Sequence, residues 1–387
     1  MKTLFVLLGI FGVVAGTAQR RAVSDAGTAQ VVPLKAANWD FSAGAVEFGD
    51  SAGVARMKIV SGNGFVVLRG CDFSDGTIEY DEILTDPSFA QMYFRWQDKQ
   101  EAECFYFRTR RGVGNPWAMD GVQYTPIIKG TMCWDAMAQY QTNAVFDRTG
   151  VTHVKLVISG KQMRVYVGSA GAAMTRPVLE VTELEGNTTH GTLAFAGQGI
   201  ISNLVLKPGK IEGLSPVAGP DPVANDPRYL RHWMMTAPDS LPAGIDFSYA
   251  LSPVAATNWA PIDAERLGLI NVSRHYAAMR SHRIVWLKTT IHADQARTCE
   301  LRLGFLDEVW MYLNDRLLYV DKNLFPQAIA KVPNGRLSLD NATVSLPLQK
   351  GDNVLRIAVG NNFYTWGIMA RLDDLDGITI ERTADGR

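Results

Sequence analysis

Motifs that mark common enzyme classes are scarce in this chain of 387 residues. Its six histidines and four cysteines form neither a His-Glu-x-x-His nor a Cys-x-x-Cys motif, the usual signatures of zinc and dithiol sites. A P-loop and a dinucleotide fingerprint are also missing. The sequence therefore predicts no metal site and no cofactor. A structural calcium ion could still be held, although no dedicated motif for one is present.

Charge of either sign is not in excess. The 38 basic and 39 acidic residues leave a formal net charge of −1, so the basic footprint of a nucleic-acid-binding protein is lacking. Beyond the N-terminus, no apolar run is long enough to cross a bilayer, which takes about 20 residues. We therefore expect neither a nucleic-acid partner nor a membrane span.

The N-terminus has the pattern of a secretory signal peptide. Lys2 precedes an apolar run from Leu4 to Ala15, and the small residues Gly16-Thr17-Ala18 follow it. Residues 1–18 are predicted to be removed before Gln19, and residues 19–30 are predicted to be a flexible leader. The protein is then secreted, periplasmic or otherwise extracellular. Because no cysteine follows the apolar run, a lipid anchor is not expected.

The rest of the chain is predicted to be all-β. Short runs rich in Val, Ile, Tyr and Phe are bounded by Gly, Asn, Asp or Pro, and this pattern is typical of sandwiches and jelly rolls. The predicted strands are 65–69, 76–81, 89–97, 103–110, 122–128, 153–159, 163–168, 191–196, 201–207, 229–236, 284–291, 299–303, 342–348, 353–359, 366–372 and 378–382. A short helix is predicted around Ile262 to Leu269.

A proline-rich stretch divides this pattern in two. Residues 208–227 contain five prolines, which cannot join central strands, and no long apolar run. We interpret them as a semi-rigid linker. The fold class is thus two β-sandwich (jelly-roll) domains, residues 31–207 and 228–383.

A hairpin from Glu308 to Val320 dominates the second half. Asn314-Asp315 tolerates positive φ and suits a two-residue hairpin loop. That loop pairs Leu313 with Arg316, and continuing the same register predicts the further pairs Met311–Leu318, Val309–Val320, Trp310–Tyr319 and Tyr312–Leu317. One face is then aliphatic and the other aromatic, so the aromatic face is covered or binds a protein partner.

The four cysteines allow three disulfide pairings in an exported protein. Cys104 and Cys133 lie in or near neighbouring predicted strands and are the favoured pair. The alternative is that all four are buried thiols.

The first half resembles the concanavalin A-like (laminin-G-type) lectin and glucanase sandwiches. The resemblance is carried by Gly76-Thr-Ile-Glu-Tyr-Asp81, Phe94-Arg95, Phe105-Tyr-Phe-Arg108, Gln123-Tyr-Thr-Pro126, Val154-Lys-Leu-Val-Ile-Ser-Gly-Lys161 and Val165-Tyr166. It implies a curved sandwich that binds or cleaves glycans on its concave sheet.

The second half looks like a galactose-binding-like jelly roll, an accessory domain of many exported glycosidases. The residues that carry this similarity are Lys288-Thr-Thr-Ile291, Asp307-Glu-Val-Trp-Met-Tyr-Leu-Asn314, Leu346-Pro-Leu-Gln-Lys-Gly-Asp-Asn353 and Trp366-Gly367. Such a resemblance implies a fold, while function has to be argued from a site.

Alternation along three strands of the first half predicts a candidate ligand face. Met92, Phe94 and Trp96 should point into the core, so the opposite face collects polar and aromatic side chains. Aromatic rings beside planar hydrogen-bonding groups suit sugars, which present C–H faces ringed by hydroxyls. The predicted ligand-binding residues are Tyr93, Arg95, Tyr106, Arg108 and Gln123, with Trp134 and Tyr140 at the rim. The alternative is an ordinary exposed face whose arginines pair with carboxylates.

Two carboxylates, Glu79 and Asp81, point the same way along one strand and are the catalytic alternative. Glycoside hydrolysis needs two carboxylates about 5–10 Å apart. The glucanases of this fold carry Glu-x-Asp-x-(x)-Glu, whereas the third carboxylate here is Glu82, which faces the other side. Exported 3-keto-glycoside hydrolases share the sandwich and openings such as Gly-Thr-Ile-Glu, so they remain a second enzymatic alternative.

A polar and aromatic loop, Asn361 to Trp366, is a candidate contact in the second half. Asn361, Tyr364 and Trp366 would touch a ligand there; alternatively, Trp366 seals the core and the asparagines cap turns. The sequence as a whole favours an exported, non-catalytic carbohydrate-binding protein of a glycan-processing system. A glycoside hydrolase and a cell-surface interaction protein remain alternatives.

Overall fold

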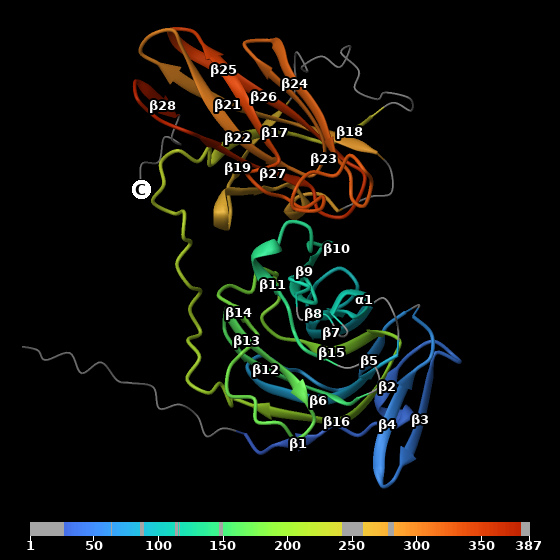
Figure 1. Cartoon of the computed structure of the whole chain (residues 1–387). Coiled ribbons are helices and arrows are strands. Elements are labelled where there is room, and N and C mark those ends of the chain that lie inside the picture. Colours follow the sequence, from blue (N-terminus) through green and yellow to red (C-terminus); the bar gives the residue numbers. More distant parts are fainter. Residues whose placement is uncertain are drawn as a thin grey trace, which may run out of the picture.

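The computed structural model describes residues 27–62, 64–85, 89–112, 115, 117–146, 150–241, 258–277 and 282–380. The predicted signal peptide and most of the predicted leader lie outside these residues. Within them the protein is almost entirely β, as predicted, and its strands form two stacked bodies (Figure 1). No helix of the described residues is long and apolar enough to span a membrane.

Two antiparallel sheets form the body nearer the N-terminus. The first has the order β14-β13-β12-β6-β16-β4-β3, with β1 beside β16, and the second the order β10-β9-β8-β7-β15-β5-β2, with β11 beside β9. The strands of the first sheet are β1 (Gln30–Val31), β3 (Val46–Ser51), β4 (Val54–Ile59), β6 (Gly76–Leu84), β12 (Thr152–Ser159), β13 (Gln162–Ser169), β14 (Leu179–Val181) and β16 (Gly199–Pro208). Those of the second are β2 (Trp39–Asp40), β5 (Val66–Leu68), β7 (Phe89–Trp96), β8 (Ala102–Arg108), β9 (Val122–Ile128), β10 (Thr131–Met132), β11 (Gln141–Thr142) and β15 (Thr192–Gly197).

Two further sheets form the second body. Their orders are β19-β17-β21-β26-β23-β24, with β18 and β28 beside β21, and β20-β27-β22-β25. The strands are β17 (His232–Thr236), β18 (Asp239–Ser240), β19 (Trp259–Asp263), β20 (Leu269–Asn271), β21 (Arg283–Ala293), β22 (Arg297–Phe305), β23 (Asp307–Leu313), β24 (Arg316–Asn323), β25 (Ala342–Leu348), β26 (Gly351–Asn361), β27 (Gly367–Leu372) and β28 (Ile378–Ile380). One helical turn, α1 (Thr109–Gly112), and the 3₁₀ turns Ala36–Asn38, Ala138–Tyr140, Arg266–Gly268 and Val272–Arg274 complete the described elements.

The predicted helix near residue 262 is wrong. The chain there forms the edge strand β19 and then a 3₁₀ turn in which Leu267 has a φ of 60°. Pro261 is accommodated because β19 pairs only with β17, so the missing N–H is not needed by a second neighbour.

The predicted disulfide is also wrong, since the four cysteines are free thiols. Cys104 lies in a cluster on the outer face of the second sheet, whereas Cys133 belongs to the core between the sheets. The two side chains are therefore on opposite faces and cannot meet.

The hairpin of β23 and β24 turns where predicted, but its register changes. Asn314 and Asp315 have φ values of 49° and 65°, and Leu313 pairs with Arg316. A bulge then shifts the pairing, so that Met311 lies opposite Tyr319 and Trp310 opposite Val320. Because β23 itself alternates without interruption, its two faces are still aliphatic and aromatic, as expected.

The aromatic face of this hairpin is covered rather than open. Trp310 and Tyr312 pack with Trp286, Ile284 and Leu241, and their exposed fractions are 1% and 4%. The opposite face joins the core of the second body through Val309 and its neighbours.

The predicted linker is held against both bodies along its length. Pro216 accepts a hydrogen bond from Lys161 of the first body, while Gly219 and Pro220 accept bonds from Arg266 of the second. Leu214 is buried beside Val157 and Tyr166. In Figure 1 the segment runs from β16 along one side of the molecule to β17.

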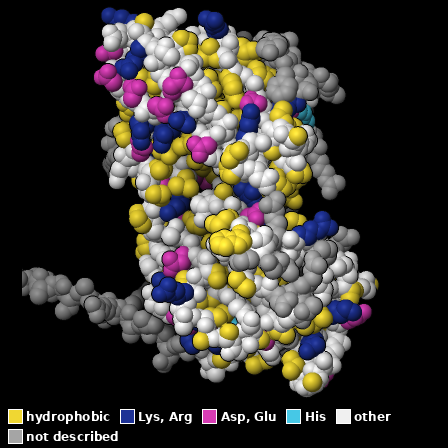
Figure 2. Space-filling view, in the orientation of Figure 1, with side chains coloured by type: hydrophobic (Ala, Val, Ile, Leu, Met, Phe, Trp, Pro, Cys, Tyr) yellow, Lys and Arg dark blue, Asp and Glu magenta, His cyan; other side chains and the backbone are white. Residues whose placement is uncertain are grey.

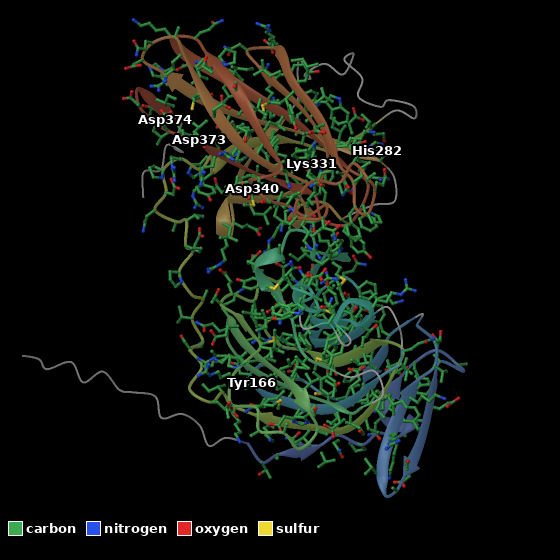
Figure 3. All side chains as sticks on the ribbon, viewed as in Figure 1. Tyr166, His282, Lys331, Asp340, Asp373 and Asp374 are labelled. Atoms are coloured by element: carbon green, nitrogen blue, oxygen red, sulfur yellow. The ribbon has the colours of Figure 1, made fainter. Side chains whose placement is uncertain are left out.

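A long loop between β24 and β25, residues 324–341, extends from the second body to the first. Figure 3 labels two of its residues, Lys331 and Asp340, on the side of the second body that faces the first. Two buried asparagines at its base, Asn323 and Asn341, donate to or accept from backbone groups of the loop and of Phe305. We call residues 324–341 the bridging loop.

The bridging loop carries an apolar side chain into the core of the first body. Leu337 is 6% exposed, and together with Leu269 and Leu306 it joins the core cluster formed by the first two sheets. Its backbone N–H donates to the carbonyl of Asp135. The two bodies therefore share one apolar interface, which fixes their relative position.

Truncating this side chain tests the interface. Leu337→Ala should lower the free energy of unfolding by about 2–4 kcal/mol, because it leaves a cavity in a buried apolar contact. Val332→Ala in the same loop, where the side chain is 75% exposed, should change it by less than about 0.5 kcal/mol. Denaturant titration measures both, and equal effects would contradict a packed interface.

Candidate functional site

A cavity of about 250 Å³ opens where the bridging loop meets the second sheet of the first body. Its lining is largely aromatic and comes from both bodies: Phe89, Gln91, Tyr106, Arg108, Met132 and Trp134 from the first, and Phe325, Phe363 and Tyr364 from the second. We call it the aromatic cavity. Figure 2 shows hydrophobic side chains among basic and acidic ones at the level where the two bodies meet.

A hydrogen-bonded polar network forms the floor of the aromatic cavity. Gln123 Oε1 accepts bonds from Tyr106 Oη (2.8 Å) and Arg108 Nη2 (2.5 Å), and Arg108 Nη2 also donates to Tyr106 Oη (2.6 Å). Gln123 Nε2 donates to the carbonyls of Trp134 and Met137. Because the partners lock each other, the Tyr106 ring and the Arg108 guanidinium are held in one orientation.

Two guanidinium groups surround the indole of Trp134. Arg108 lies 5.6 Å and Arg336 lies 5.2 Å from its ring centroid, within cation–π range. Arg336 Nη2 pairs with Asp120 Oδ2 at 3.2 Å, and Arg108 Nη1 donates to the Asp120 carbonyl. A basic group from the second body thus completes an aromatic and basic cluster in the first.

The wall formed by the second body is positioned by a buried carboxylate. Asp307 Oδ2 accepts the backbone N–H groups of Asn362 and Phe363. Phe363 then lies 6.1 Å from Phe325 in a stacked arrangement, and Tyr364 packs edge-on to Trp134 at 5.8 Å. Phe363 and Tyr364 remain 36% and 39% exposed, so they form the mouth of the cavity.

The structure brings four of the predicted ligand-binding residues together. Tyr106, Arg108 and Trp134 line the aromatic cavity, and Gln123 supports them from below. The alternative interpretation, an ordinary exposed face, is wrong, because Trp134 and the bridging loop cover this face: these residues are 0–7% exposed. Tyr93 lies on the same face but is buried with Phe65 and Trp96, outside the cavity lining.

Arg95 does not belong to this face. It has a φ of 49°, and the pairing of β7 with β15 shifts at this point, so the alternation reverses. Its guanidinium is buried and bonds to the Asp75 carboxylate and to the carbonyls of Ser74 and Gly160. Trp96 consequently turns outward instead of into the core.

Tyr140 also lies elsewhere. It packs edge-on to Tyr124 in the core between the sheets, with its hydroxyl 3.5 Å from Thr182 Oγ1. In the second half, Tyr364 reaches the cavity, whereas Asn361 and Trp366 are both fully buried. Trp366 belongs to the core and donates from Nε1 to the Val359 carbonyl.

The alternative catalytic pair, Glu79 and Asp81, lies outside the aromatic cavity. Glu79 pairs with Lys207 at 2.6 Å, and Asp81 contacts His153 at 2.6 Å and accepts from Asn203. Neither lines the aromatic cavity or the other cavities described here. Glu82 points to the opposite face, as expected, and is buried.

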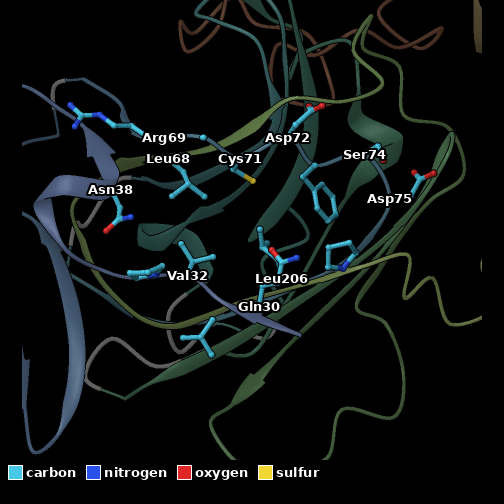
Figure 4. Close-up of a pocket in the computed structure, with 15 residues that line it drawn as sticks. Gln30, Val32, Asn38, Leu68, Arg69, Cys71, Asp72, Ser74, Asp75 and Leu206 are labelled. Carbon is cyan, nitrogen blue, oxygen red and sulfur yellow. The ribbon is translucent and has the colours of Figure 1, made fainter. Parts of the chain in front are cut away.

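Another cavity, of about 310 Å³, lies in the first body between β1, β16 and the segment from Leu68 to Asp75 (Figure 4). The side chains of Arg69, Asp72 and Asp75 point away from it in Figure 4. Each has a protein partner, respectively Asp40, His190 and Arg95. In the described part of the chain, no group of three His, Cys, Asp or Glu side chains is arranged to hold a metal ion.

Two lining residues, Phe89 and Phe325, and the neighbouring Arg336 are not among the predicted site residues. Phe325 and Arg336 come from a segment without strand alternation, and Phe89 is predicted only to begin a strand. Phe363 lies in the loop that the sequence predicts as a ligand contact, although the contact predicted beside it is Tyr364. A weak signal existed: Phe325 and Arg336 belong to an 18-residue connection within a compact domain, and loops of that length are often functional.

No protein-family model matches the chain, and no curated protein matches its sequence. Among solved structures, it is similar to the carbohydrate-binding module CBM66 from Bacillus subtilis, with 14% identity, a TM-score of 0.29, and coverage of 42% of this chain and 87% of that one.

Two other solved structures are similar to the chain to about the same degree. A galectin-like-fold protein of unknown function from Bacillus subtilis is 11% identical with a TM-score of 0.30, covering 42% of this chain and 85% of that one. The exoplasmic/lumenal domain of VIP36, in a form with Ca²⁺ and Man3GlcNAc, is 11% identical with a TM-score of 0.33, covering 46% and 86%. Each similarity concerns less than half of this chain.

Three carboxyl groups near the interface, Asp135, Glu185 and Asp307, are buried. Burial raises the pKa of Asp135 to about 8, of Glu185 to about 8 and of Asp307 to about 7. In the first body, burial likewise raises the pKa of Glu82 to about 8 and of Glu103 to about 7. The cause is the cost of holding a charged carboxylate away from water.

These groups make stability depend on pH. Their folded-state pKa values lie above the unfolded values near 4, so the folded protein binds more protons between about pH 4 and pH 8. Their contribution is therefore fully present below about pH 4 and lost as the pH rises through 7 to 8. Thermal unfolding should show a higher midpoint at pH 5 than at pH 8.

Asp135→Asn should flatten this profile, because the amide has no proton to lose. Asp376→Asn, at a side chain that is 93% exposed, serves as the control and should leave the profile unchanged. A midpoint that rises steadily from pH 5 to pH 8 would contradict the assignment of raised pKa values.

Proposed function

We propose that this is an exported, non-catalytic carbohydrate-binding protein whose glycan site is the aromatic cavity between the two bodies. The observation that carries the proposal is the convergence of aromatic rings from both bodies over a locked Tyr106–Arg108–Gln123 network. The signal-peptide pattern of residues 1–18 supports export, because it fits the secretory pathway.

The chemistry of the lining fits a sugar better than a purely apolar ligand. Phe325, Phe363 and Tyr364 offer ring faces and edges for the C–H surface of a pyranose, beside the buried Trp134. Arg108 and Tyr106 add directed hydrogen-bonding groups at the floor, which apolar ligands do not use. A small cavity with a few convergent polar groups is the usual form of a small-molecule site.

The same lining favours binding over hydrolysis. A retaining or inverting glycosidase needs two carboxyl groups facing the scissile bond. Among the described residues, no carboxyl group lines the aromatic cavity. Asp135 and Asp307 lie in the surrounding structure, where Asp307 is committed to the backbone N–H groups of the loop that ends in Tyr364.

The hydrolase remains the second candidate because Glu79 and Asp81 share the outer face of β6, as a carboxylate pair requires. The interaction-protein candidate has less support, since the hairpin's aromatic face, its predicted contact, is buried.

Affinity electrophoresis through gels that contain single polysaccharides tests the proposal. The intact protein should be retarded by at least one member of a panel of mannan, xylan, galactan, β-glucan and pectin. Tyr364→Ala and Phe363→Ala should each weaken that binding about tenfold, the effect expected when a contact at the mouth of a buried site is lost. Val217→Ala, at an exposed side chain in the linker, should bind like the wild type.

Unretarded migration in every gel would contradict carbohydrate binding. Retardation that Tyr364→Ala and Phe363→Ala leave unchanged would place the glycan site elsewhere.

A reducing-sugar assay separates binding from catalysis. The wild type should release no product from a polysaccharide that it binds, and Glu79→Gln with Asp81→Asn should retain wild-type binding, because both carboxylates lie outside the cavity. Product release that this double variant abolishes would establish the hydrolase instead.

A further inference from the structure

A second cavity, of about 480 Å³, has Arg336 in its lining. Its lining again comes from both bodies and includes Arg110, Asn115, Trp117, Asp120, Asn334 and Arg336. Arg336 is in this lining and also packs on Trp134, which lines the aromatic cavity. The contact between Arg336 and Trp134 therefore links the linings of the two cavities.

Trp117 is the most exposed large hydrophobic side chain of the described residues, at 85%. The folded chain does not bury this indole, which shares the lining with polar groups such as Asn115 and Asn334. It can stack on the C–H face of a pyranose, while the adjacent amides bond to hydroxyl groups.

Positive charge is in excess around this second cavity. Arg110 and Arg336 contribute two guanidinium groups, whereas Asp120 is the one carboxylate among the described lining residues. Asp135, which follows Trp134 in the chain, is held mostly neutral at pH 7, since burial raises its pKa to about 8. No ion pair is formed by Arg110 with any described residue.

Of the groups in this lining, the buried and positively charged Arg336 would be stabilised most by a bound anion. Its side chain is 4% exposed, and its buried Nε has no hydrogen-bond partner among the described residues. Burial lowers its pKa, and the positive charge of Arg108 lowers it further. A carboxylate or sulfate beside it would supply both an acceptor and a compensating charge.

We infer that the cavity lined by Trp117, Arg110 and Arg336 binds the anionic sugar residue of an acidic polysaccharide. This inference rests on the proposed function and narrows its ligand to a chain bearing carboxylate or sulfate groups. The pyranose ring lies on Trp117 and the anion lies against the two arginines, while neighbouring sugars extend into the aromatic cavity. General attraction to polyanions is not the reason, because the net charge of the protein is −1.

Matched pairs of polysaccharides separate the contribution of the anionic group to binding from that of the sugar chain that carries it. Polygalacturonate and its fully methyl-esterified form differ only in the carboxylate, and dextran sulfate and dextran differ only in the sulfate. The intact protein should bind one charged member at least tenfold more tightly than its neutral counterpart. That preference should weaken between 50 mM and 500 mM NaCl, because salt screens ion pairs.

Trp117 and Arg110 are exposed, so their variants test the site without threatening the fold, whereas Arg336 is buried and is changed only to lysine. Trp117→Ala should weaken binding of the preferred charged polysaccharide about tenfold, and Arg110→Gln about threefold to tenfold. Arg336→Lys keeps the charge but removes the planar fork, so it should fall between wild type and Trp117→Ala. Arg316→Gln makes the same charge change at the distant tip of the hairpin and should have no effect.

The outcomes distinguish the two claims. Equal binding of charged and neutral members, with loss on Tyr364→Ala but not on Trp117→Ala, would overturn the anionic site and leave the aromatic cavity as the glycan site. Equal weakening by Arg316→Gln and Arg110→Gln would show that overall charge governs binding, which also overturns it. Binding of no polysaccharide at all would overturn the proposed function as well.

Discussion

The ion pair between Arg336 and Asp120 joins the two bodies at the point on which the candidate site depends. Both side chains are buried, so their charges are compensated by protein groups rather than by water. Breaking such a pair by removing one partner is strongly destabilising, even where the intact pair adds little net stability. The main effect of the pair here is to fix the position of the bridging loop. It holds the bridging loop where Phe325 can cover Trp134 and where Leu337 can enter the core of the first body.

This constraint explains why the site is shared. The outer face of the second sheet carries Tyr106, Arg108 and Trp134, which would form an exposed aromatic and basic surface in an isolated sandwich. The bridging loop covers that surface in part and leaves a cavity rather than a closed interface. Asp307 then holds the backbone ahead of Tyr364, so the opposite wall is also fixed. Each wall is set by groups of one body, and their separation is set by the ion pair.

Local patterning made most of the architecture predictable. Short strands, their turns and the proline-rich connection follow from period-two alternation and from turn residues, and the φ values of Asn314 and Asp315 agree with the predicted hairpin turn. The predictions were wrong where a single residue interrupts the period-two alternation of a strand. The irregularity at Arg95 reversed the faces of β7, and the bulge in β24 shifted the hairpin register. A bulge is decided by the neighbouring strand and the packing around it, which a single strand's sequence does not reveal.

The candidate site was predictable in part for the same reason. Tyr106, Arg108, Gln123 and Trp134 were found because alternation puts the first three on one face and the loop after β10 adds the fourth. Tyr364 was found because its loop is both polar and aromatic, and Phe363 lies beside it in that loop. Phe325 and Arg336 were missed because contacts between distant loops depend on the docking of the two bodies. The burial of Cys104 and Cys133 on opposite sheet faces was likewise a matter of three-dimensional placement.

The central claim is that one glycan touches both bodies at once in the aromatic cavity. Hydrogen–deuterium exchange of the intact protein, with and without an oligosaccharide cut from a polysaccharide that it binds, tests this claim most directly. The account predicts slower exchange both around residues 131–137 in the first body and around residues 362–365 in the second. Protection confined to one body, or centred on the strand that carries Glu79 and Asp81, would contradict it.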